Sequence, residues 1–187
     1  MIYIIDDFLE NNLLESLKKE LIDFKQVDTP GKSFWVKPAH EDFIRHVLDK
    51  LEVIEGKSLK NILGFFREAN VNQDNEWRIH NDSKSGVYKE QPNRALVLFM
   101  SDNKENGLNG TAFWEHKKYG DQFPKNSTTK EADRMLKNEA NDLSRWNLRS
   151  IVGHKKNRLV SYPCSYFHSK YPNEFKQSRV VFVMFYK

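Results

Sequence analysis

The stretch RVVFVMFY, Arg179 to Tyr186, consists mostly of β-branched and aromatic residues behind a single arginine, and this composition predicts an apolar β-strand. Several short segments after Leu59 share its texture: ILGFFREA, EWRIHND, RALVLFM, GTAFW and RLVSYP. Gly/Asn-rich connections such as SDNKENGLNG separate most of these segments. A series of short strands of this kind predicts a β-sandwich or barrel over residues 59–187.

The N-terminal part of the chain, residues 1–58, predicts a strand followed by two helices. IYIIDDFL predicts a short strand that enters a turn, where Asp7 can cap the helix that follows. DTPGKS is expected to be a loop between the helices, and the second helix is expected to end at Gly56. The helices are marked by apolar residues at helical spacing, namely Leu13, Leu14, Leu17, Leu21 and Phe24, then Phe43, Ile44, Val47, Leu48 and Leu51.

Residues 127–150, STTKEADRMLKNEANDLSRWNLRS, interrupt the series of strands and lack strand texture. They predict an inserted helix or pair of helices, which could form a lid over a site. The expected fold is therefore α+β, with N-terminal helices that support a β core and a helical segment inserted in that core.

Length and composition fit one compact domain over residues 1–187. The chain contains 39% hydrophobic residues, including 13 Phe, 7 Tyr and 4 Trp, which can fill a sizeable core. The mean hydropathy is −0.74, and no apolar run approaches the roughly 18 to 20 residues of a membrane span. Acidic residues appear within the first seven positions, unlike a signal peptide. We therefore expect a cytoplasmic protein with no membrane partner.

The charged and sulfur-containing residues limit the kinds of site that the chain can build. Cys164 is the only cysteine, so a metal site must use histidine and carboxylate ligands. The formal net charge is +4, but basic residues alternate with acidic ones in segments such as KKELIDFK. Interspersed charge of this kind is typical of a solvated surface rather than of a dedicated nucleic-acid interface.

His80 and Asp82 are a first pair of candidate metal ligands. If EWRIHND is a strand, residues i and i+2 lie on the same face, so the imidazole and the carboxylate project together. The two groups can occupy adjacent positions in the coordination shell of a metal, but a third ligand is needed to hold it. Taken alone, the pair reads more simply as a strand-end histidine and a turn-forming aspartate.

His168 is the best third ligand because of where it stands. It closes RLVSYPCSYFH, and Arg179 follows eleven residues later at the head of an apolar strand. A buried arginine is costly unless it meets an anion, and its planar guanidinium can bind a carboxylate through two parallel hydrogen bonds. The weaker candidates lie at helix ends, in a basic turn or beside an acidic residue that faces the other way: His40, His46, His154 and His116.

The order His80-x-Asp82, then His168, then Arg179 resembles the Fe(II)/2-oxoglutarate-dependent dioxygenases, and within them the prolyl-4-hydroxylase-like branch. The resemblance extends over most of the chain from Ile2 to Lys187. IIDDFL is similar to the family's opening strand, NRALVLFMSDN to the strand after the metal motif, LNGTAFW to a Gly-Gly-Thr segment, and NRLVSYP…FHS to the distal-histidine strand. The resemblance implies a double-stranded β-helix core of the jelly-roll or cupin type.

The resemblance also implies a role for each of these residues. His80, Asp82 and His168 would hold Fe(II), Arg179 would bind the distal carboxylate of the cosubstrate 2-oxoglutarate, and Thr111 would contribute to the cofactor site. O₂ would be the second cosubstrate, and ascorbate is an additional candidate cofactor. The implied reaction is hydroxylation of a substrate, with decarboxylation of 2-oxoglutarate to succinate and CO₂.

Three segments depart from the family pattern; in one of them, REANVNQDN, the tyrosine usually found before the metal motif has no clear match. Phe99-Met100-Ser101 stands where Tyr-Leu-Asn is common, so a tyrosine hydroxyl that helps to hold 2-oxoglutarate in some members is missing there. Asn109 replaces the first glycine of the Gly-Gly-Thr segment. These departures concern the contacts of the cosubstrate and leave the three ligands and Arg179 in place.

Residues around the mouth of such a site would choose the substrate, which we expect to be a small molecule or a peptidyl side chain. Three candidates flank the metal motif and two follow the strand of Thr111; they are Trp77, Arg78, Tyr88, Trp114 and His116. For Trp77 and Trp114, packing in the core is an equal alternative, because large aromatic side chains are usually buried in part.

Two functions from other classes remain open at the level of the sequence. A cupin-like barrel could bind metal without consuming 2-oxoglutarate. A basic module could instead bind nucleic acid through scattered lysines and exposed aromatic rings, and its binding would weaken steeply with salt.

Overall fold

The computed structural model describes residues 1–29, 32–69, 76–83, 90–102, 108–124, 127–174 and 177–187. The helices in these ranges are α1 (Asn11–Glu20), α2 (Glu41–Glu55) and α3 (Thr129–Glu139), with a 3-10 turn at Leu143–Arg145. The strands are β1 (Tyr3–Ile5), β2 (Lys25–Thr29), β3 (Lys32–Pro38), β4 (Asn61–Ala69), β5 (Arg94–Phe99), β6 (Gly110–His116), β7 (Trp146–Gly153), β8 (Leu159–Pro163), β9 (His168–Tyr171) and β10 (Arg179–Tyr186). No helix in the described ranges is long and apolar enough to cross a membrane.

Most of the strands form a seven-stranded antiparallel sheet with the order β1-β8-β5-β10-β4-β3-β2. The strand β10 lies in its middle, where Phe182 pairs with Leu98 of β5 on one side and with Phe66 of β4 on the other. A strand with a neighbour on each side and apolar layers above and below needs apolar residues on both faces. The prediction of an apolar strand from RVVFVMFY is therefore confirmed, and the strand is central rather than at an edge.

The smaller sheet has the order β7-β6-β9, again antiparallel. The pairing of β6 with β7 shifts between Phe113 and Trp114. His80 forms an isolated β-bridge with His168, the first residue of β9. The predicted metal motif therefore adjoins the edge of this sheet.

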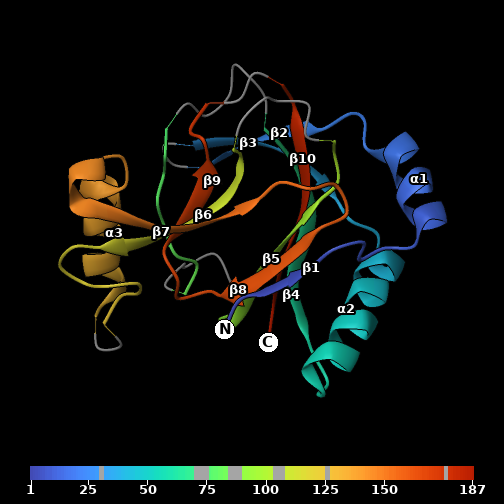
Figure 1. The fold of residues 1–187 in the computed structure, drawn as a ribbon, viewed down its shortest axis with the longest axis horizontal. Helices are drawn as coiled ribbons and strands as arrows, with labels where there is room; N and C mark the ends of the chain where they lie inside the picture. Colours follow the sequence, from blue (N-terminus) through green and yellow to red (C-terminus); the bar gives the residue numbers. More distant parts are fainter. Residues whose placement is uncertain (30–31, 70–75, 84–89, 103–107, 125–126, 175–176) are drawn as a thin grey trace.

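The sheets and helices form layers (Figure 1). The helices α1 and α2 lie on one side of the larger sheet, and α3 lies beside the smaller sheet. A first apolar cluster joins α1 and α2 to the larger sheet, with members such as Leu17, Val47, Leu51, Leu98, Phe182 and Met184. A second cluster fills the space between the two sheets and includes Val97, Phe99, Phe113, Val152, Val160, Tyr162 and Val181. A third packs α3 against the smaller sheet through Ile79, Ala112, Trp114, Ala132, Met135, Trp146 and Phe167.

Four local predictions differ from the structure. Lys25–Thr29 and Lys32–Pro38, a stretch read in part as a loop, are the paired strands β2 and β3 at the edge of the larger sheet. EWRIHND is not a strand, since His80 alone forms a bridge within the described range 76–83. The helical prediction for 127–150 is correct at α3 and wrong after it, where Trp146 begins β7. Asp7 does not cap α1, because Glu10 occupies the N-cap position.

Asn157 ties the N-terminal segment to the turn before β8. Its side chain is buried; Oδ1 accepts a hydrogen bond from the Leu9 N–H at 2.8 Å, and Nδ2 donates to the Leu9 carbonyl at 2.8 Å. The Phe8 N–H donates to the Asn157 carbonyl. Asn157 has a φ of 64°, a left-handed conformation that asparagine tolerates better than most residues. The residue therefore satisfies several main-chain groups where α1 joins the sheet.

We expect Asn157→Ala to lower the free energy of unfolding by about 2 to 4 kcal/mol, because both main-chain groups of Leu9 lose their buried partner. Urea denaturation would measure the change. Asn147→Ala, at an exposed position of β7, is the matched control and should change stability by less than about 0.5 kcal/mol. Equal effects of the two substitutions would contradict the anchoring role of Asn157.

Candidate metal centre and cosubstrate site

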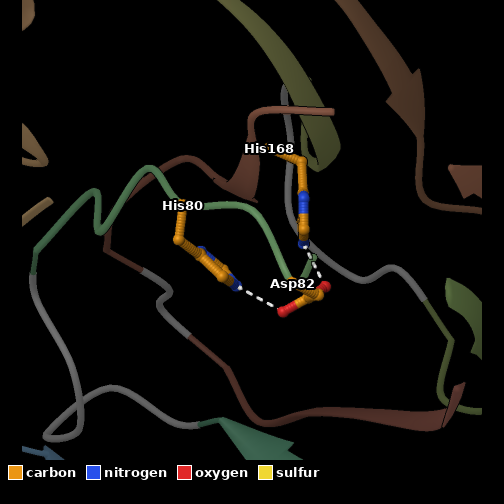
Figure 2. Close-up of side chains that lie close together, drawn as sticks. All are labelled: His80, Asp82 and His168. Carbon is orange, nitrogen blue, oxygen red and sulfur yellow. Dashed lines mark ion pairs between the residues drawn. The ribbon is translucent and has the colours of Figure 1, made fainter. Parts of the chain in front are cut away.

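Three side chains far apart in the sequence meet at the edge of the smaller sheet (Figure 2). Nε2 of His80 lies 3.7 Å from Oδ1 of Asp82, and Nε2 of His168 lies 3.4 Å from Oδ2 of the same carboxylate. One ligand atom from each residue lies within 4.8 Å of the others. The side chain of His80 is 34% exposed, against 13% for Asp82 and 7% for His168. The cluster therefore opens to solvent on the side of His80.

Main-chain hydrogen bonds hold the three residues at this spacing. The His80 N–H donates to the His168 carbonyl at 3.0 Å, and the His168 N–H donates back to the His80 carbonyl at 2.8 Å. The Asp82 N–H donates to the Cys164 carbonyl at 2.8 Å. The sequence predicted that His80 and Asp82 project together, and they do (Figure 2), but this arrangement comes from one bridge and a turn rather than from a regular strand.

Both imidazoles are held in the same tautomer. Nδ1 of His80 lies 2.7 Å from the carbonyl oxygen of Arg78, and Nδ1 of His168 lies 3.0 Å from that of Tyr166. A carbonyl oxygen can only accept, so Nδ1 carries the proton in each ring and Nε2 presents a lone pair to the cluster. A hydrogen bond of this kind on the second nitrogen is the usual arrangement of a metal-ligating histidine.

The donor set fits a metal ion. Two neutral imidazole nitrogens and one carboxylate, close together and on one side of the cluster, are the ligands of the facial site that non-haem Fe(II) uses. The carboxylate also supplies the negative charge that a divalent cation requires. His80, Asp82 and His168 are therefore the residues that could hold the ion.

Arg179 lies at the start of β10, in the space between the two sheets. It is only 7% exposed. Nη1 donates a hydrogen bond to the Gly110 carbonyl at 3.0 Å, and the guanidinium carbon lies 4.9 Å from the centre of the Phe99 ring. Burial, with the positive charge of Arg67, lowers the pKa of Arg179 to about 9. A bound carboxylate would favour the charged form and raise this pKa.

Gly110 is required where it stands. Its φ is 156°, and a Cβ at this position would lie 1.9 Å from the Val152 carbonyl oxygen. A side chain would therefore displace β6 from β7 at the point where the Gly110 carbonyl orients Arg179. The packing of β6 against β7 therefore explains why a glycine stands at position 110.

Thr111 and Tyr162 line the same space between the sheets. Thr111 is buried and follows Gly110 on β6, where alternation puts it on the face of Phe113. Tyr162 was not singled out from the sequence; its ring lies 4.7 Å from that of His168 and 5.1 Å from that of Phe113. The alternation of β8 could have revealed it, since Tyr162 shares a face with buried Val160.

The residues predicted to contact the substrate lie in different parts of the structure. Trp77 and Arg78 directly precede His80 and are half-buried. Trp77 packs its ring against those of Trp114 and Tyr171. Trp114 is buried and donates a hydrogen bond from Nε1 to Ser169 Oγ at 2.9 Å. Tyr88 lies outside the described residues.

His116 is placed under α3, away from the three ligands. It is 2% exposed, and its ring stacks on Tyr119 and meets Trp146 edge to face. Nε2 lies 2.8 Å from a carboxylate oxygen of Glu139. The structure thus gives the imidazole partners inside the protein, and a substrate contact by His116 stays a prediction without support from its position.

Known proteins resemble this chain in structure, whereas the sequence comparisons found no match. No protein-family model matches the chain, and no curated protein matches it in sequence. HygX from Streptomyces hygroscopicus, with nickel, 2-oxoglutarate and hygromycin B bound, has a TM-score of 0.62 at 15% identity, and the match covers 99% of this chain and 82% of that one.

Two prolyl hydroxylases are also similar in structure. The viral collagen prolyl hydroxylase of Paramecium Bursaria Chlorella virus-1, in complex with 2-oxoglutarate, has a TM-score of 0.54 at 13% identity, over 99% of this chain and 94% of that one. A prolyl-4-hydroxylase from Pseudomonas putida has a TM-score of 0.58 at 8% identity, over 100% and 91%. At these identities the likeness shows the fold. The resemblance to the prolyl-4-hydroxylase-like branch of the 2-oxoglutarate oxygenases is confirmed at that level, and the chain has their fold.

Proposed function

We propose that this protein is an Fe(II)- and 2-oxoglutarate-dependent oxygenase that hydroxylates its substrate. The observation that carries the proposal is the cluster of His80, Asp82 and His168, in which both imidazoles present Nε2 to one carboxylate. Such a facial set leaves the other coordination positions of Fe(II) open. Structures of HygX with iron, and with nickel and 2-oxoglutarate, support the same choice of metal and cosubstrate.

Arg179 is proposed to bind the distal carboxylate of 2-oxoglutarate. The Gly110 carbonyl and the Phe99 ring orient its guanidinium before any ligand arrives, so two parallel hydrogen bonds can form without rearrangement. Gly110 marks the arginine end of the space, and Phe113, which pairs with His168, marks the metal end. Three residues of strand span about 10 Å, which leaves room for a small dicarboxylate.

The two sheets are proposed to form the double-stranded β-helix of this fold, with the cosubstrate between them. Thr111 would add a hydroxyl contact from the inner face of β6. The apolar side chains of Val97, Phe113 and Val181 lie in the same space and would exclude water there. A dry environment strengthens the attraction between Arg179 and a carboxylate.

When bound, iron with 2-oxoglutarate and O₂ supplies the oxidation, which converts 2-oxoglutarate to succinate and CO₂ and adds one oxygen atom to the substrate. The residues of the chain bind, orient and protect the reacting groups. The substrate is proposed to be a small molecule or a peptidyl side chain; the neighbours include both kinds, with hygromycin B bound to HygX and collagen named for the viral hydroxylase. Trp77 and Arg78, half-buried beside His80, would contact it.

Anaerobic titration with Fe(II) and 2-oxoglutarate tests the proposal. We expect the weak visible charge-transfer band of a chelated 2-oxo acid to appear, followed by formation of succinate when air is admitted. Ascorbate can be included to keep the iron reduced.

Folded protein that gives neither the band nor succinate would exclude this function. Iron binding without any effect of 2-oxoglutarate would favour the cupin-like alternative. Binding to nucleic acid that weakens with salt, and that His80→Ala does not change, would favour a nucleic-acid-binding module.

A further inference from the structure

One peptide plane connects the metal cluster to the end of α3. The carbonyl of Arg78 accepts the hydrogen bond from Nδ1 of His80 at 2.7 Å, and the N–H of Ile79 donates to the carbonyl of Ala140 at 3.0 Å. The Arg78 carbonyl and the Ile79 N–H belong to the same rigid peptide unit. The bond to Ala140 therefore fixes the direction in which the Arg78 carbonyl points, and so the orientation of the His80 ring.

A second bond holds the other side of Arg78. Its N–H donates to Oδ1 of Asn141 at 2.9 Å. Arg78 has a φ of 48°, in the left-handed region that a long side chain rarely adopts. Such a conformation persists where surrounding contacts impose it. The bond to Asn141 lies directly before the φ/ψ pair of Arg78, and the bond to Ala140 directly after it.

The end of α3 is itself fixed to the smaller sheet through Glu139. Its carbonyl accepts from Nε1 of Trp146 at 2.7 Å, and its carboxylate lies 2.8 Å from Nε2 of His116. Nδ1 of His116 accepts hydrogen bonds from the N–H groups of Lys118 and Tyr119. The proton of His116 must then be on Nε2, from which it is donated to Glu139.

The ring of His168 is oriented by a similar pair of main-chain hydrogen bonds, but α3 takes no part in them. Nδ1 donates to the Tyr166 carbonyl, and the next N–H, that of Phe167, donates to the Asp121 carbonyl at 3.1 Å. Each ligating histidine therefore follows an anchored peptide plane. The anchor of His80 is supplied by the segment around α3, and His80 is the more exposed of the two rings.

We propose that Asn141, with Glu139 and His116 behind it, is a positioning residue for the metal ligand His80. The segment that was expected to form a lid would then be part of the rigid frame of the metal centre. The proposal rests on the function proposed above, because it assumes that His80 binds a metal.

Titration of metal-free protein with Co²⁺ tests this role without turnover. We expect Asn141→Ala, and Asn141→Leu of nearly equal volume, to weaken Co²⁺ binding by about 10-fold, because Arg78, whose carbonyl holds Nδ1 of His80, loses the acceptor of its N–H. Asn141→Asp retains an acceptor oxygen at the same place and should restore affinity to within about threefold of the wild type. Asn141 is exposed, so the fold should survive each change, which near-ultraviolet circular dichroism would verify.

A further control separates positioning from general stability. Tyr186→Phe removes a buried hydroxyl that bonds to Ser161 and Glu55 in the apolar layer under α2; it should lower the melting temperature and leave Co²⁺ affinity unchanged. Equal Co²⁺ affinity of the wild type, Asn141→Ala and Asn141→Leu would overturn the positioning role, and so would an equal loss in Asn141→Asp. Failure of the wild type itself to bind Co²⁺ would instead overturn the metal centre and the inference with it.

Discussion

Asp82→Ala is expected to reduce Fe(II) affinity by at least about 100-fold and to abolish succinate formation. Asp82 is the one anionic ligand of the cluster, with an oxygen directed to each imidazole. Its loss removes both a ligand and the charge that offsets a divalent cation. We therefore expect a larger loss of affinity than the 10- to 100-fold that follows from losing a hydrogen-bond partner behind a ligand. Iron content after anaerobic loading, and Kd by titration, would measure the change.

The fold should survive this substitution because the main-chain bond from the Asp82 N–H to the Cys164 carbonyl is retained. Asp133→Ala, on the exposed face of α3, is the matched control and should bind iron as the wild type does. Unchanged iron content in folded Asp82→Ala would show that the three residues are not the metal site.

Arg179→Gln is expected to weaken 2-oxoglutarate binding by about 100- to 200-fold while Fe(II) affinity stays the same. Truncating one partner of a buried charge pair costs about 2 to 5 kcal/mol, and about 3 kcal/mol corresponds to this factor. Arg179→Lys should recover only part of the affinity, because an ammonium group cannot donate two parallel hydrogen bonds to a carboxylate. Anaerobic titration that follows the charge-transfer band of the metal-loaded protein would give the constants.

The control for this prediction is Arg149→Gln, which removes an exposed arginine of β7 that pairs with Glu115. It should leave the Kd for 2-oxoglutarate unchanged. If Arg179→Gln binds 2-oxoglutarate as tightly as the wild type does, the space between the sheets is not the cosubstrate site.

Two residues of the candidate site, Arg179 and His168, could be singled out from the sequence by their positions, whereas His80 and Asp82 gained meaning only beside them. Arg179 heads an otherwise apolar strand, and the structure buries it in the space between the sheets. His168, read from the sequence as the end of a strand, begins β9 in the structure and precedes Arg179 by eleven residues. A charged residue at the head of an apolar strand is visible in a single sequence, so it could be noticed without a structure.

The path of the backbone around His80 could not be predicted in the same way. EWRIHND has strand texture, but the N–H groups of Arg78 and Ile79 bond to Asn141 and Ala140. Partners about sixty residues away thus replace a neighbouring strand. The pattern of residues within EWRIHND cannot indicate hydrogen bonds to partners so far away in the sequence.

The strands β2 and β7 were missed for a different reason. Both β2 and β7 lie at the edges of their sheets, where many side chains face solvent, as Asn147 and Arg149 of β7 do. Edge strands often carry charged residues that discourage further pairing. Without an apolar face, such a strand looks like a loop or a helix in the sequence.

The reciprocal hydrogen bonds between His80 and His168 have a thermodynamic consequence. Because they belong to the folded backbone, the spacing of the two ligands is set when the chain folds, and an arriving cation meets a preorganised site. In the unfolded chain the same two residues are separated by 87 others, so the ion has little affinity for that state. Metal at 100 times its Kd should therefore raise the free energy of unfolding by about 2.7 kcal/mol, and slow hydrogen exchange at these two amides would report the linkage.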